Sequence, residues 1–101
     1  MAIRVRYHDY GEAGSRLRAI VDRRVALLEQ ALAHEPGDKT LFIDMHYDLR
    51  EDAVHAHLTL DLGAETLRAD GSARDRTVAL TSAFATLCRA VRARAGLIST
   101  V

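Results

Sequence analysis

The side chains with the most binding chemistry in this sequence are its arginines. Thirteen of its fourteen basic residues are arginine, and Lys39 is the single lysine. A guanidinium group can hold a phosphate through two parallel hydrogen bonds and can also stack on a base. Codon bias is an alternative explanation, because alanine is abundant and asparagine is absent. The residue types alone thus make phosphate groups the first class of ligand to consider.

The formal net charge of zero hides a separation of charge along the chain. Segment 76–95 carries four arginines and no acidic residue, which gives it a charge of +4. Segment 16–34 carries four arginines against Asp22 and Glu29, which gives +2. Both segments have helical periodicity, so two helices would hold a surplus of +6 that the rest of the chain balances.

The spacing of these arginines determines whether they can act together. Arg89 and Arg92 are three residues apart, and Arg16 and Arg23 are seven apart, so each pair projects from one side of its helix. Two helices side by side on one sheet would place both pairs on a common surface. This surface is either a phosphate-binding face or a solvated helix exterior, in which arginines near a helix C-terminus are favoured by the helix dipole.

Histidines form a second group that could bind a ligand. If Tyr47 pairs with Val54 in a hairpin, four side chains face one another on the solvent side: His46 with His55, and Asp44 with His57. Imidazoles with a carboxylate can bind a transition metal. A polar exterior with a histidine–aspartate contact is the alternative, and we expect neither a metal nor any other cofactor.

The sequence offers little support for an enzyme. No glycine-rich phosphate loop follows a predicted strand. None of the four serines stands in a nucleophile-elbow context: Ser15, Ser72, Ser82 and Ser99. A single cysteine, Cys88, excludes an internal disulfide and a cysteine-rich zinc site. We interpret Cys88 as a small apolar residue on a helix.

Periodicity predicts six elements that would position these groups. Alternating apolar residues indicate strands, and apolar residues every three or four positions indicate helices. The predicted strands are 3–8, 40–48, 54–62 and a shorter 65–70, and the predicted helices are 16–34 and 76–95. Among the residues expected to point inward are Val5, Tyr7 and Tyr47.

Glycine, proline and capping residues predict the boundaries. Ser15 and Asp75 are the expected N-caps of the two helices. Pro36-Gly37 and Gly96 are expected to end them, and residues 71–74 are expected to form a loop.

The order β-α-β-β-β-α predicts an α+β domain over residues 1–101, ordered from about 2 to 96. A four-stranded sheet would be covered by both helices on its aliphatic face, and its polar face would meet water. The helical crossover should make the first two strands parallel.

No apolar run reaches the roughly 18 residues that a membrane span requires, and the N-terminus lacks a long apolar stretch, so we expect a cytoplasmic protein without membrane contact.

The pattern of the second half, with supporting residues in the first helix, resembles a known family. Residues 54–95 contain a strand ending near a glycine, a short strand with an inward alanine, an acidic residue and a helix with Ala79-Leu80 and Leu87-Cys88-Arg89. Residues 21–29 add a helical pattern ending in Leu-Glu. These features resemble the ribosome hibernation-promoting factors and ribosome-associated inhibitors, also called sigma-54 modulation proteins, here as a diverged short form.

The resemblance implies a fold akin to double-stranded-RNA-binding domains. It also implies binding to small-subunit rRNA in the channel for messenger and transfer RNA, which blocks translation in idle cells without catalysis. Arg18, Arg24 and Arg89 match basic residues of the family, and Arg92 lies beside another. Family members often carry lysine where this chain has Leu27 and Thr86.

We therefore predict a ribosome-associated translation inhibitor that binds the small ribosomal subunit through six arginines: Arg16, Arg18, Arg23, Arg24, Arg89 and Arg92. The alternative is a protein-interaction module of the same fold that forms a homodimer through an exposed edge strand. Phe42 favours that alternative, because it alternates onto the outward face.

Overall fold

The predicted element order is confirmed by the computed structural model, which describes residues 3–11 and 14–99, with side chains as far as Arg94. The elements are β1 (Arg4–His8), α1 (Ser15–Ala31), β2 (Thr40–Asp48), β3 (Ala53–Asp61), β4 (Thr66–Ala73) and α2 (Arg76–Ser99). Within the described ranges, no helix has both the length and the apolar character needed to cross a membrane.

The four strands form one sheet in the order β1-β2-β3-β4. β1 and β2 are parallel, as the helical crossover predicts, and the other two neighbouring pairs are antiparallel. Tyr47 pairs with Val54 across the β2–β3 hairpin, which is the register that the histidine pairing assumed. This register sets which polar side chains share the outward face.

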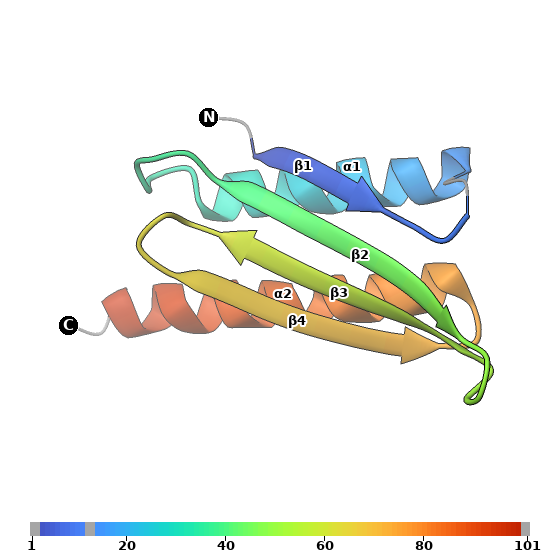
Figure 1. Cartoon of the computed structure of the whole chain (residues 1–101). Helices are drawn as coiled ribbons and strands as arrows, with labels where there is room; N and C mark the ends of the chain where they lie inside the picture. The colour runs from blue at the N-terminus through green and yellow to red at the C-terminus, as the bar shows by residue number, and fades with distance from the viewer. Residues whose placement is uncertain (1–2, 12–13, 100–101) are drawn as a thin grey trace.

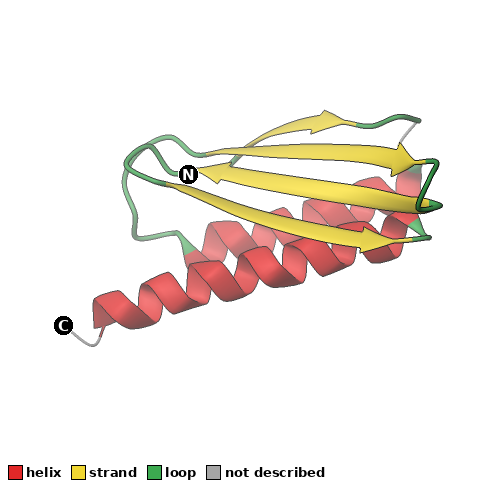
Figure 2. Ribbon diagram, turned by 60° about the horizontal axis from the view of Figure 1, so that its bottom comes forward, coloured by secondary structure: helices red, strands yellow, loops and turns green. Residues whose placement is uncertain are grey.

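Both helices cover the same face of the sheet, with α1 behind β1 and β2 and α2 behind β3 and β4 (Figure 1). Seen from another side, the molecule has two layers, and one face of the sheet carries no helix (Figure 2). The core between the layers is apolar and mostly aliphatic, and its largest fully buried side chains include Phe84, Leu28, Met45 and Leu58. The inward strand residues alternate with exposed or half-buried ones because successive side chains of a strand point to opposite faces.

Two residues expected inward are less buried than their alternation implies. Val5 is 36% exposed and Tyr47 is 40% exposed. Val5 belongs to β1, which has no neighbour on its outer edge, and Tyr47 lies near the hairpin end of β2. The ring of Tyr47 instead packs against the ring of Tyr10, at 6.2 Å between centroids. Tyr7 is half-buried against the core.

The fourth strand is longer than predicted, because Gly71 belongs to β4 and not to a loop. A Cβ atom at residue 71 would lie 2.3 Å from the carbonyl oxygen of Ala79 and 2.6 Å from the backbone nitrogen of Ala83. Gly71 therefore allows the backbone of α2 to approach β4 closely, as glycine does where two backbones meet. The loop predicted for residues 71–74 is therefore wrong for residues 71–73, which belong to β4.

The helix boundaries differ from the prediction at three places. α1 starts at Ser15 itself, with Gly14 as the N-cap, and no side chain caps that end. It ends at Ala31 and not at 34, although Leu32 remains buried after it. α2 continues through Gly96 to Ser99, because one glycine lowers helix stability by only about 1 kcal/mol and need not end a helix.

The predicted cap of the second helix is confirmed. The carboxylate of Asp75 accepts a hydrogen bond of 2.6 Å from the backbone N–H of Thr77. This contact satisfies one of the free N–H groups at the start of α2 and fixes where the helix begins.

Candidate nucleic-acid interface

A groove with a volume of about 680 Å³ is lined by residues of α1 and α2, and three of the predicted arginines are among them. Arg24 comes from α1, and Arg89 and Arg92 come from α2. Apolar side chains such as Leu28 and Val91 line it as well. Because both helices pack on one face of the sheet, arginines more than sixty residues apart in sequence lie along one groove.

The six predicted arginines keep their charges available. Arg24 is half-buried and the other five are exposed. Six ion pairs join side chains within residues 3–11 and 14–94, and none of them includes any of these six arginines. Cations without an acidic neighbour are free to bind an external anion.

The charge of +4 predicted for the second helix overstates the charge that α2 presents to an external anion, because Arg76 forms an ion pair within the molecule. Its guanidinium forms an ion pair with Asp9, whose side chain is only 2% exposed. The hydroxyl of Tyr7 donates a hydrogen bond of 2.6 Å to the same carboxylate. Burial alone would raise the pKa of Asp9, but the hydrogen bonds from Tyr7 and Arg76 outweigh burial and hold it below its usual value.

Arg94 is also bound within the molecule. Its guanidinium contacts the carboxylates of Glu35 and Glu65, which joins α2 to the loops before β2 and β4. The hydrogen bond from Arg94 lowers the pKa of Glu35. Lys39 is buried, and its ammonium group donates to the carbonyl oxygens of Glu35 and Gly37 at 2.7 and 3.1 Å. The only lysine thus stabilises a loop and is not available to an external phosphate.

Arg89 is held in place at the groove by a short chain of hydrogen bonds along α2. Its guanidinium donates to the hydroxyl of Thr86 at 3.2 Å, and that hydroxyl donates to the backbone carbonyl of Ser82 at 3.2 Å. Thr86, one of the two departures from the family pattern, therefore orients an arginine. Leu27, the other departure, lines the groove and is 48% exposed.

Arg16 and Arg23 continue the basic surface toward the start of α1. Arg23 lies four residues before Leu27 and seven before Gln30, and both of those residues line the groove. Arg16 lies seven residues before Arg23 and so projects from the same side. Arg16 and Arg23 do not line the groove themselves, and their spacing places them on the same side of α1 as the residues that do.

Arg18 does not join this group. It lies six residues from Arg24, and six residues rotate a helix position by about 120° from its starting direction. Arg18 lines a different hollow of about 380 Å³ with Tyr7, Val21 and Asp22, beside β1. The six-residue spacing already indicated that Arg18 and Arg24 point in different directions from α1. We name the five remaining arginines, Arg16, Arg23, Arg24, Arg89 and Arg92, the groove arginines.

The outward face of the sheet carries the other predicted groups. Phe42 lies there and is 43% exposed. The predicted histidine pairs are present, with His46 opposite His55 and Asp44 opposite His57. Asp44 also contacts His8 at 3.1 Å, and His57 contacts Asp70 at 2.5 Å. This face lies on the other side of the sheet from both helices (Figure 2).

Two solved structures resemble this arrangement. The N-terminal domain of Protein Y from Thermus thermophilus superposes with a TM-score of 0.71 and 18% sequence identity, over 90% of this chain and 96% of that domain. A ribosomal subunit interface protein from Coxiella burnetii superposes with a TM-score of 0.59 and 11% identity, over the whole of both chains. This chain has their fold. The similarity supports the predicted family at the level of the fold, whereas no family model and no curated protein matches the sequence.

Proposed function

We propose that this protein is a ribosome-associated factor that binds small-subunit rRNA through the α1–α2 groove and thereby inhibits translation. The observation that carries the proposal is the groove itself, in which Arg24, Arg89 and Arg92 have no acidic partner among the described residues. The fold shared with a ribosomal subunit interface protein adds support. The proposed role belongs to the cytoplasm and needs no catalytic group.

The groove suits the backbone of RNA better than its bases. Arginine forks bind phosphate oxygens with two hydrogen bonds and release counterions from the nucleic acid. No aromatic side chain lines the groove, so sequence reading by base stacking has no platform there. Specificity must then come from the shape of a confined rRNA site, since phosphate contacts are independent of sequence.

Salt dependence gives this mode of binding a measurable size. Each arginine–phosphate contact contributes about −0.7 to −0.9 to the slope of log affinity against log salt. Three contacts therefore predict a loss of roughly thirtyfold in affinity between about 50 and 200 mM salt. The flanking groove arginines, Arg16 and Arg23, would steepen this dependence.

The test is co-sedimentation with purified small ribosomal subunits over a salt series. The double variant Arg89→Glu/Arg92→Glu should bind at least tenfold more weakly at about 100 mM salt. A matched control, Arg6→Glu/Arg68→Glu, changes the charge equally at exposed residues of the strands and should bind like the unchanged protein. No co-sedimentation at about 50 mM salt would refute ribosome binding. Equal losses in both double variants would refute the groove as its site.

The alternative function, a homodimerising interaction module, has its own support in the structure. β1 and β4 are the edges of the sheet, and Phe42 is exposed on the outward face next to β1. Light scattering after size exclusion separates monomer from dimer. A dimer that Phe42→Ser converts to monomer would favour this alternative, and a monomer at all concentrations would remove it.

A further inference from the structure

Three histidines gather on the face of the sheet that carries no helix. His46 of β2 lies directly opposite His55 of β3, and the two ring centroids are 5.2 Å apart. His57 lies two residues further along β3, with its ring centroid 5.0 Å from that of His46 and 6.3 Å from that of His55. The confirmed β2–β3 register produces this cluster, because side chains two apart on a strand share a face.

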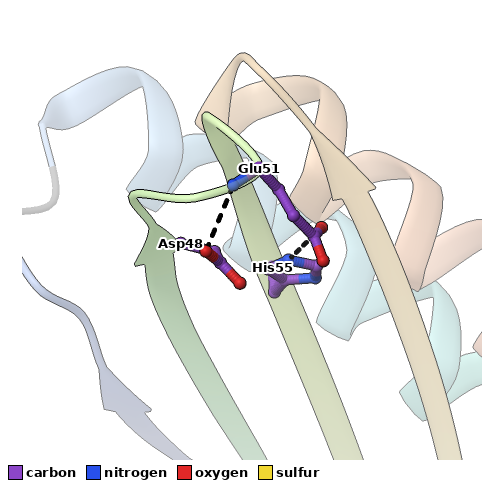
Figure 3. A group of neighbouring side chains, drawn as sticks. All are labelled: Asp48, Glu51 and His55. Atoms are coloured by element: carbon purple, nitrogen blue, oxygen red, sulfur yellow. Dashed lines mark hydrogen bonds and ion pairs between the residues drawn. The ribbon is translucent and has the colours of Figure 1, made fainter.

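Two carboxylates join the cluster at the end of the hairpin. A carboxylate oxygen of Asp48, one of Glu51 and a ring nitrogen of His55 all lie within 4.8 Å of one another (Figure 3). The Nε2 atom of His55 is 3.2 Å from Oε2 of Glu51. Asp48 lies two residues after His46, so both project to the outward face.

The hairpin holds Asp48 in position. Its Oδ1 atom accepts the backbone N–H groups of Arg50 and Glu51, at 2.8 and 3.2 Å. The same turn brings the side chain of Glu51 back over His55, as the dashed contacts in Figure 3 show. The local sequence thus fixes the backbone that presents both carboxylates.

We propose that His46, His55, Asp48 and Glu51 form a site for a divalent transition metal ion, with Zn²⁺ as the expected ion. Two imidazole nitrogens and two carboxylate oxygens are ligands that zinc accepts in a tetrahedral arrangement. A tetrahedral ion bound at about 2.1 Å holds two imidazole ring centres roughly 5 Å apart. The centroid separation of 5.2 Å for His46 and His55 matches that requirement.

Asp48, Glu51 and His55 already hold their ligand atoms within 4.8 Å of one another, whereas His46 lies outside that group and its ring must move to coordinate the ion. The rings of His46 and His55 are stacked with 22° between their planes, so they must rotate to direct a nitrogen at a common point. Rotation about χ2 of histidine has a broad energy profile. Glu51 is 60% exposed, so its side chain can move without disturbing the core. His57 already contacts Asp70, so it is a neighbour of the site and is not required as a ligand.

The proposal is tested by titrating the whole protein with Co²⁺ and then with Zn²⁺. Tetrahedral Co²⁺ absorbs strongly in the visible range, so we expect one equivalent to produce that absorption and Zn²⁺ to abolish it. His46→Ala and His55→Ala should each weaken Co²⁺ binding at least tenfold. The control variants His8→Ala, on the same face, and His34→Ala, after α1, should change it less than twofold.

Each remaining outcome decides against the site. Absence of the absorption band at millimolar Co²⁺ would overturn the proposal. Binding that the double variant His46→Ala/His55→Ala leaves unchanged would identify an adventitious ion only. Because all four ligands are half-buried or exposed, these variants should keep the far-ultraviolet circular dichroism of the folded protein. The site lies away from the groove, so its failure and a failure of rRNA binding are separate results.

Discussion

Asp9 and Arg76, 67 residues apart, form an ion pair that joins the end of β1 to the first residue of α2. The carboxylate has almost no contact with solvent, and the hydroxyl of Tyr7 donates a hydrogen bond to it from within β1. Tyr10 adds its ring to this cluster, with the guanidinium carbon of Arg76 5.3 Å from the ring centroid. This contact links the segment that follows β1 to the start of α2.

Replacing Asp9 by asparagine should destabilise the protein by about 2 to 3 kcal/mol, because it removes the negative charge of a buried carboxylate that pairs with the guanidinium of Arg76. Urea unfolding followed by circular dichroism measures this change. Asp44→Asn is the matched control, since Asp44 is 55% exposed and forms its ion pair with an exposed histidine, His8. The control should cost less than about 1 kcal/mol. Equal effects of the two substitutions would contradict a special role for Asp9.

Acid should destabilise the folded protein by protonating two carboxylates, those of Asp9 and Glu35. The pKa values of Asp9 and Glu35 are lowered in the folded state, so both carboxylates contribute stability above their unfolded values of about 4. That contribution is lost as the pH falls through the lower, folded pKa values. A series of unfolding curves between pH 7 and pH 2 should show stability decreasing below about pH 4. Asp9→Asn should flatten this decrease.

At high pH, ionisation of Tyr7 should lower the stability of the folded protein. Burial, followed by the hydrogen bond to Asp9 and the charge of Asp9, raises the pKa of Tyr7 from 10.0 to about 12. A raised folded pKa gives stability that is complete below the unfolded value and is lost as the pH rises through the folded one. Unfolding curves between pH 9 and pH 12 should therefore show a decrease that is absent in Tyr7→Phe. A decrease of the same size in that variant would assign it to other groups.

Gly71 should be among the least replaceable positions of the sheet. Alanine there would place a Cβ atom against backbone atoms of Ala79 and Ala83, which cannot move aside as a side-chain end can. We expect Gly71→Ala to destabilise the protein by about 3 kcal/mol or more, which is at the upper end for overpacking. Ser72→Ala, at the next residue of β4 and exposed, should stay within about 0.5 kcal/mol. Thermal unfolding of the two variants provides the comparison.

Local patterns predicted the fold well because each element has a clear period. The alternation fixed which face each strand residue takes, and the pairing of Tyr47 with Val54, assumed from the sequence, is the one present. Gly71 was misinterpreted because a turn glycine and a close-packing glycine look alike until the helix above it is placed. The difference depends on a contact across the fold, which no local window contains.

The candidate site was predictable only in part for the same reason. The helical surplus of charge singled out Arg89 and Arg92, which both line the groove, and their binding to rRNA stays a prediction. It could not reveal that Arg76 and Arg94 are bound by Asp9, Glu35 and Glu65, which come from distant segments. The sequence pattern also could not reveal that Asp48 and Glu51 lie close to His55, because the turn after β2 brings these side chains together.

The two departures from the family pattern make the groove testable by a gain of function. Leu27 and Thr86 both lie beside groove arginines, and each stands where family members often carry lysine. If the groove binds phosphates, Leu27→Lys should raise affinity for small ribosomal subunits and steepen the salt slope by about 0.7 to 0.9. Leu27 is the cleaner position, because replacing Thr86 also removes the hydroxyl that orients Arg89.

The control for this gain is Val78→Lys, which adds the same charge at an exposed residue of α2 outside the groove. Val78 is 54% exposed and Leu27 is 48% exposed, so both lysines can extend into solvent. Co-sedimentation at about 50, 100 and 200 mM salt gives the slope for each variant. A steeper slope for Leu27→Lys alone is the expected result, because only a charge within reach of the bound phosphates releases further counterions. Equal slopes for the two lysine variants would show that net charge, and not the groove, controls binding.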